Sequence, residues 1–64
     1  MSKGYKKLQK ERKRHHMSCK DMAFLLNISP GYYWQLENGT RRLFYDLAVR
    51  IAEIFQMKPD DLFY

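Results

Sequence analysis

The chain has 64 residues, with 12 Lys and Arg against 7 Asp and Glu, and a formal net charge of +5 at neutral pH. This length predicts one domain, residues 1–64, with a small core and marginal stability. The single Cys cannot form an internal disulfide and suits a reducing compartment. No apolar run approaches the roughly 20 residues of a membrane span, and no apolar segment follows the charged N-terminus as in a secretory signal. We therefore expect a cytoplasmic protein with no membrane association.

The positive charge is concentrated in the first two thirds of the chain. Residues 1–42 carry ten Lys or Arg against three acidic residues, a net +7, whereas residues 43–64 carry two against four, a net −2. A merely solvated surface would spread its charge more evenly. The asymmetry favours a polyanionic partner, with nucleic acid as the leading candidate.

Two short helices are expected first. Apolar residues at helical spacing predict a helix over about 5–15, after a frayed start at residues 1–4. Ser18 should cap the second helix, with Asp21 three residues later completing a capping box. The apolar side of this second helix is expected to consist of Met22, Ala23, Leu25 and Leu26.

The stretch from Lys20 to Arg42 has the spacing of a helix-turn-helix. Ala23 is small where two helix axes must approach closely, and Asn27, four residues later, tolerates a left-handed turn position. Ile28 should pack beneath the turn as an apolar anchor. In a small basic chain this combination indicates DNA binding.

A third helix is expected directly after the turn. Ser29 is a good N-cap, Pro30 suits the first helical position, and Asn38-Gly39 should end the helix. Tyr33 and Leu36 lie three residues apart on one side of it. We expect these two side chains to face the core.

Two further helices complete the predicted fold. Residues 43–56 carry apolar side chains at helical spacing from Leu43 onward and predict the main core helix. Pro59 should open a short last helix, with Leu62 and Phe63 closing the core. Because no segment has the pattern of a strand, the predicted fold class is all-α, a compact arrangement of five helices.

The sequence gives no pattern typical of an enzyme or a metal site. His15, His16 and Cys19 are close in sequence, but no second Cys or His cluster completes a tetrahedral set. Cys19 has no orienting acid at a defined spacing, the chain is short for a substrate pocket, and no Gly-rich phosphate loop is present. We expect no enzymatic activity, no metal and no cofactor.

Several segments resemble, in order and spacing, the Cro/phage-repressor (Xre-type) helix-turn-helix family from about Leu8 to Phe63. The matching segments are Leu8-Gln9-Lys10-Glu11-Arg12, Met17-Ser18, Ala23 with Asn27-Ile28-Ser29, Gln35-Leu36-Glu37-Asn38-Gly39, Leu47-Ala48-Val49-Arg50-Ile51-Ala52 and Pro59-Asp60-Asp61-Leu62-Phe63. The resemblance implies a five-helix, lambda-repressor-like DNA-binding domain with the helix-turn-helix in its second and third helices.

The resemblance also implies roles for individual residues. The helix at about 30–38 would enter the major groove, where the amide of Gln35 can pair with adenine. An ion pair between Arg12 and Glu37 would be structural. The residues expected at the DNA are Lys20, Pro30, Gly31, Tyr32, Gln35, Asn38, Thr40, Arg41 and Arg42.

Some positions depart from the family pattern. Members often carry Gln where this chain has Cys19, polar base-reading residues where it has Pro30 and Gly31, and Leu where it has Glu11. Base recognition would then depend on fewer polar groups, together with thymine methyl contacts and DNA shape.

Three consecutive aromatic residues, Tyr32, Tyr33 and Trp34, cannot all face one way on a helix. Tyr33 is assigned to the core. Tyr32 either contacts a phosphate or sugar or is merely exposed. For Trp34 the edge of the core, a partner surface and the DNA backbone all stay open.

The main hypothesis is a cytoplasmic, sequence-specific DNA-binding transcriptional regulator, a repressor, that binds double-stranded operator DNA as a homodimer on two half-sites. Its dimer contacts would come from the last two helices or Phe63-Tyr64, or form only on DNA. The alternative is a protein-interaction module, antirepressor-like or antitoxin-like, that retains the fold. A third option is an architectural DNA binder without sequence preference.

Overall fold

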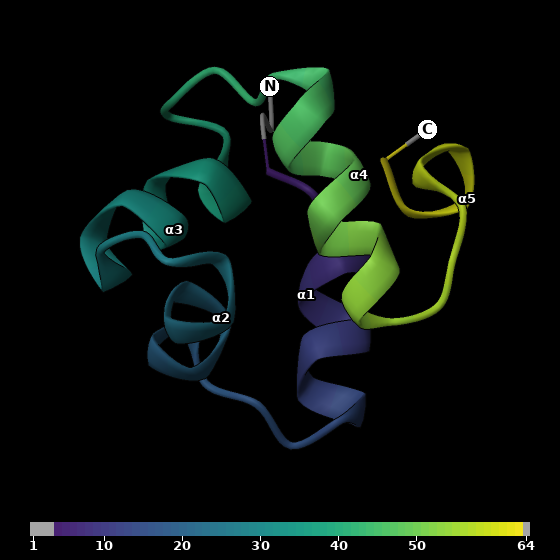
Figure 1. Ribbon diagram of the computed structural model, residues 1–64, viewed down its shortest axis with the longest axis horizontal. Coiled ribbons are helices and arrows are strands. Elements are labelled where there is room, and N and C mark those ends of the chain that lie inside the picture. The colour runs from purple at the N-terminus through teal and green to yellow at the C-terminus, as the bar shows by residue number, and fades with distance from the viewer. Residues whose placement is uncertain (1–3, 64) are drawn as a thin grey trace.

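The computed structural model describes residues 4–63, which form five helices and no strand (Figure 1). The helices are α1 (Lys6–Arg14), α2 (Cys19–Leu26), α3 (Pro30–Asn38), α4 (Tyr45–Ile54) and α5 (Pro59–Phe63). α2 packs against α3, α1 contacts both α3 and α5, and α4 packs on α5. The all-α arrangement of five helices predicted from the sequence is confirmed. No helix within the described residues is long and apolar enough to cross a bilayer.

Residues 1–3 and Tyr64 lie outside the described residues. The predicted fraying of residues 1–3 and the predicted dimer contact of Tyr64 therefore concern residues that the structure does not describe. Gly4, the last residue of that segment, is half-buried, and a Cβ built on it would lie 3.3 Å from the Glu37 carbonyl oxygen. The next amide, that of Tyr5, donates a 2.9 Å hydrogen bond to the same carbonyl. The start of the described chain is therefore fixed to the end of α3.

The helix-turn-helix forms through local hydrogen bonds. The Ser18 hydroxyl accepts a 3.0 Å hydrogen bond from the Asp21 amide, and the Asp21 carboxylate accepts a 2.9 Å hydrogen bond from the Ser18 amide, which confirms the capping box. Asn27 adopts the left-handed conformation at φ 60° and ends α2. Ser29 then caps α3, because its hydroxyl accepts from the Tyr32 amide at 3.1 Å. Gly39, at φ 78°, ends α3.

Two expectations about apolar residues were wrong. α4 begins at Tyr45, and Leu43 lies in the loop before it, half-buried against the core. Helical spacing alone cannot separate a helical residue from a loop residue that packs beneath the helix. Leu25 is 52% exposed, because the core side of α2 is centred on Met22, Ala23 and Leu26 and Leu25 points away from it.

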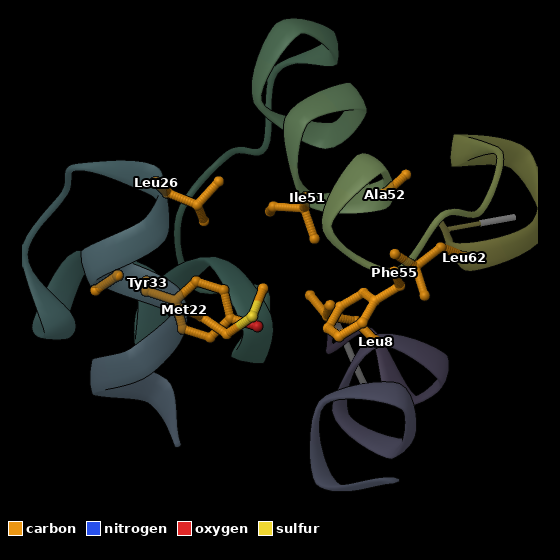
Figure 2. Packing of buried hydrophobic residues seen from close by; sticks show 9 residues of the cluster. Leu8, Met22, Leu26, Tyr33, Ile51, Ala52, Phe55 and Leu62 are labelled. Carbon is orange, nitrogen blue, oxygen red and sulfur yellow. The ribbon is translucent and has the colours of Figure 1, made fainter. Parts of the chain in front are cut away.

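The core receives side chains from every helix (Figure 2). Tyr33 of α3 is fully buried, as the sequence predicted. The other fully or almost fully buried residues of the cluster are Leu8, Met22, Ala23, Leu26, Ile51, Ala52 and Leu62. Arg50 of α4 adds a polar link, because its Nη2 donates a 3.0 Å hydrogen bond to the Leu26 carbonyl at the end of α2. The core and this link together hold α2 and α3 in one orientation.

A buried ion pair joins α1 to α3. Arg12 Nε donates to Glu37 Oε1 at 2.8 Å and Arg12 Nη2 donates to Glu37 Oε2 at 3.0 Å, with the two residues only 8% and 5% exposed. Arg12 Nη1 donates to the Met17 carbonyl at 2.9 Å, and the Tyr33 hydroxyl donates to Glu37 Oε1 at 2.8 Å. Within residues 4–63 no buried side-chain polar atom lacks a hydrogen-bond partner. The network is therefore complete, as a buried charge pair requires.

Loss of one partner of this pair should destabilise the domain severely. We expect Arg12→Ala to lower the free energy of unfolding by about 3–5 kcal/mol, because it leaves the Glu37 carboxylate buried without its counter-charge. Urea unfolding followed by circular dichroism measures this. The control is Arg14→Ala, which removes an exposed pair with Glu11 from the same helix and should leave the midpoint nearly unchanged. Equal midpoints for the two variants would contradict a stabilising role for the buried pair.

The same network makes stability depend on alkaline pH. Burial, and then the hydrogen bond to Glu37, raise the pKa of the Tyr33 hydroxyl well above its ordinary value of about 10. The folded state retains this proton where the unfolded chain releases it, so this contribution to stability is present below pH 10 and is lost as the pH rises above that value. We expect Tyr33→Phe to make unfolding free energy fall less steeply between about pH 9.5 and 11 than in the wild type.

Denaturant unfolding curves, recorded at several values across this pH range, measure the free energy of unfolding and test this prediction. Tyr45→Phe removes a hydroxyl from an exposed residue and is the matched control, which should retain the wild-type slope. If Tyr33→Phe shows the wild-type slope as well, the buried hydroxyl is not the group responsible.

Candidate nucleic-acid interface

The outward side of α3 is defined by the residues that face the core. Tyr33, Leu36 and Glu37 point inward, and at about 100° per residue the opposite side carries Gly31, Gln35 and Asn38. We call these three residues the outer row. A Cβ built on Gly31 meets no atom within 4 Å. The fold therefore does not require glycine at this position.

Gln35 supplies the polar side chain at the centre of the outer row. It is half-buried, and within residues 4–63 its side-chain amide makes no hydrogen bond, whereas its main-chain carbonyl accepts one from the Gly39 amide at the end of α3 and three more from the following loop. The loop donors are the Thr40 amide at 3.0 Å, the Arg41 amide at 3.3 Å and the Thr40 hydroxyl at 3.3 Å. The backbone of Gln35 thus fixes the following loop, while its amide is available to a ligand.

Asn38 and Thr40, both expected at the DNA backbone, have partners within the domain. Asn38 Nδ2 donates a 2.8 Å hydrogen bond to the Trp34 carbonyl, and the Thr40 hydroxyl donates to the carbonyl of Gln35. Both residues are exposed. These bonds add to the main-chain hydrogen bonds that end α3.

The loop after α3 brings its two arginines against aromatic rings. The Arg41 guanidinium carbon lies 5.2 Å from the centroid of the half-buried Tyr32 ring, and that of Arg42 lies 5.1 Å from the Phe44 ring. Both arginines are exposed. The structure thus joins Tyr32 of α3 and Arg41 of the loop, which the sequence had only placed at the same expected interface.

Lys20 and Pro30 meet at the other end of the helix-turn-helix. They line one shallow hollow of about 210 Å³ together with Ala23, Phe24 and Ile28. Phe24 is 84% exposed, and it is not among the residues predicted for the apolar side of α2, although no sequence pattern marked it as part of a surface beside Pro30. Lys20 thus lies beside an apolar surface at the start of α3.

Two ambiguous residues are now located. Trp34 is 53% exposed and flanks the outer row, so it is not a core residue.

Cys19 is half-buried, and burial raises the pKa of its thiol above the ordinary value, an effect that the positive charge of Arg12 opposes. A thiol with a raised pKa is a poor nucleophile at neutral pH.

The resulting surface combines the outer row of α3, which carries the amides of Gln35 and Asn38, with cations at both ends of the helix. The outer row of α3 lies between Lys20, near the start of this helix, and Arg41 and Arg42, which follow its end. Cationic side chains of this kind bind phosphate groups, and amide side chains bind base edges. This arrangement suits a ligand that combines a regular anionic backbone with hydrogen-bonding groups between the phosphates.

Known structures share this fold. The chain superimposes with a TM-score of 0.81 on the restriction-modification controller protein C.AhdI from Aeromonas hydrophila, at 24% identity over 91% of this chain and 88% of that one. Two structures of the clp gene regulator ClgR from Corynebacterium glutamicum give TM-scores of 0.80 and 0.78, each at 21% identity over 88% of this chain. The chain spans 60% and 73% of the lengths of these two ClgR chains. None of the curated protein sequences matches the chain significantly.

The sequence itself identifies the family. Residues 8–62, from the start of the core in α1 to the last buried leucine in α5, match the helix-turn-helix family HTH_3. The match includes the buried ion pair, the turn at Asn27 and the outer row of α3. This protein belongs to the HTH_3 helix-turn-helix family, the Cro/C1-type group that its motifs resemble.

Proposed function

We propose that this protein is a sequence-specific transcriptional repressor that inserts α3 into the major groove of operator DNA. Family membership supports the general statement, a DNA-binding transcriptional regulator. The observation that carries the specific proposal is the outer row of α3 between Lys20 at one end and Arg41 and Arg42 at the other. A helix fits the major groove, which is about 12 Å wide, and flanking cations can then contact phosphates on its rims.

The outer row limits how bases could be recognised. In the first turn of α3, Pro30 offers no N–H and Gly31 no side chain, so Gln35 is the main hydrogen-bonding group for a base edge. Its amide can donate to and accept from one adenine. We infer that the remaining specificity depends on apolar contacts, including those of Pro30 with thymine methyl groups, and on DNA shape.

We further propose that two copies bind DNA around a two-fold axis. Each α3 would then occupy one half-site, with centres roughly 34 Å apart, one turn of B-DNA. C.AhdI is a restriction-modification controller protein and ClgR is a clp gene regulator, and their roles support a regulatory role for this chain as well.

Exposed apolar side chains favour one alternative function. Phe24 and Trp34 expose large apolar surfaces on α2 and α3, as a protein-interaction module would. If that function is the correct one, the outer row and the loop arginines would be dispensable for activity.

DNA binding across a salt series distinguishes the proposals. We expect the purified protein to bind duplex DNA from upstream of its own gene more tightly than a scrambled duplex, with both affinities falling as salt rises. Arg42→Ala should weaken binding to both duplexes and reduce the salt slope by about one, because one phosphate contact is lost. Gln35→Ala should instead lower the preference for the specific duplex by about 1–3 kcal/mol.

The other outcomes of this assay are equally informative. Equal salt-dependent binding to both duplexes would show a DNA binder without sequence preference. Failure to bind either duplex, in a protein shown to be folded, would contradict the proposal and favour the protein-interaction alternative. Sedimentation of the protein with and without the specific duplex would show whether two copies assemble on it.

Gly31 offers a test of the position of α3 in the complex. Because its surroundings in the domain are open and its backbone is helical, Gly31→Ala should keep the fold and raise the free energy of unfolding by up to about 1 kcal/mol. If the first turn of α3 lies against the DNA, the added methyl group should lower affinity for the specific duplex at least about threefold by preventing close approach. Unchanged affinity would show that the first turn of α3 does not contact the DNA closely.

A further inference from the structure

The five arginines of this protein fall into two groups by their partners. Arg12 and Arg14 donate to carboxylates, and Arg50 donates to a main-chain carbonyl. Arg41 and Arg42 lie over the rings of Tyr32 and Phe44, and within residues 4–63 neither has a hydrogen bond or an ion pair from its side chain. The two consecutive arginines of the loop after α3 are thus the ones held by aromatic rings.

An aromatic ring orients a guanidinium in a way that a carboxylate does not. The ring attracts the cation through its face, while the N–H donors of a stacked guanidinium stay in its plane and point outward. A carboxylate would occupy two of these donors and neutralise the charge. Arg41 and Arg42 therefore keep both their charge and their donors for an anion outside the domain.

The loop backbone places these arginines close to their rings. The amides of Thr40 and Arg41 both donate to the Gln35 carbonyl, which folds the loop back along the last turn of α3. This brings Arg41 beside Tyr32, nine residues earlier in the chain and on the side of α3 next to the outer row. The ring of Tyr32 thus couples the position of Arg41 to that of α3 itself.

We propose that Tyr32 and Phe44 are positioning residues that hold the guanidinium groups of Arg41 and Arg42 ready for phosphate contacts. This inference rests on the proposed function and assigns a role to two exposed or half-exposed aromatic residues without invoking a protein partner. Holding each long side chain before binding lowers the conformational entropy lost on binding. The expected effect of removing one ring is roughly a two- to fivefold loss of DNA affinity, the size of an exposed cation–π interaction.

The first measurement needs no DNA. Ring-current shifts of the Arg41 side-chain protons, measured by NMR in the full chain, should move toward random-coil values in Tyr32→Leu and stay near wild type in Tyr32→Phe. Tyr45→Leu is the matched control, because Tyr45 is an exposed aromatic residue over whose ring no arginine of the described chain lies. Random-coil shifts for Arg41 in the wild type would overturn the proposal whether or not the protein binds DNA.

A double-mutant cycle on the specific duplex tests the role in binding. Tyr32→Leu should lower affinity two- to fivefold in the wild-type background with an unchanged salt slope, and should have no further effect in an Arg41→Ala background. Tyr32→Phe should bind like the wild type. An equal loss from Tyr32→Leu in both backgrounds, or a loss in Tyr32→Phe, would overturn the positioning role, the latter because it indicates a direct contact from the hydroxyl.

The second pair keeps the proposal testable if Tyr32→Leu does not fold. Phe44 is 60% exposed, so Phe44→Leu should leave the melting temperature unchanged, and the same cycle with Arg42→Ala applies. If the losses of DNA affinity from Phe44→Leu and Arg42→Ala are additive, the proposal is overturned for the pair Phe44 and Arg42. If the wild type binds no DNA at all, the proposed function fails, whereas the ring-current shifts still report whether the arginines are held.

Discussion

The fold depends on the buried contact between Arg12 of α1 and Glu37 of α3. Glu37 lies in the last turn of a nine-residue helix, and helices this short are not stable alone. Its carboxylate accepts from Arg12 and from the Tyr33 hydroxyl, and its carbonyl accepts from the Tyr5 amide. Because all these donors converge on one residue, the inward side of α3 is fixed at its C-terminal end, and the outer row is fixed with it.

The two ends of α3 are held by different kinds of interaction. At its start, the Ser29 hydroxyl caps the helix and the left-handed Asn27 sets the turn from α2. Farther from α3, Arg50 binds the Leu26 carbonyl and joins the end of α2 to α4. These polar links supplement the apolar core, which is small in a chain of 64 residues. The helix proposed to read DNA is thus positioned by its buried side chains Tyr33 and Leu36 together with these hydrogen bonds and one ion pair.

The sequence was sufficient to predict features that depend on local chemistry. The cap at Ser18, the left-handed Asn27 and the inward direction of Tyr33 each follow from the residue type and its spacing, and the structure has them all. The start of α4 and the exposure of Leu25 were not predictable in this way, because they depend on which side of an apolar segment meets a neighbouring helix. For the same reason the ring beneath Arg41 could not be foreseen, since it comes from a different element.

The division of roles within α3 has a consequence for how recognition can vary. Tyr33, Leu36 and Glu37 are committed to the core and the ion pair, whereas a Cβ on Gly31 would meet no atom within 4 Å and the Gln35 amide has no partner within the described residues. Substitutions in the outer row should therefore alter binding with little effect on the free energy of folding, because binding and folding depend on different side chains of α3. The cations at the two ends belong to other elements, and in the proposed complex they would supply affinity that does not depend on the DNA sequence. If the proposed function holds, a change of operator would require changes at only a few positions of α3, while the scaffold and the proposed phosphate contacts would stay the same.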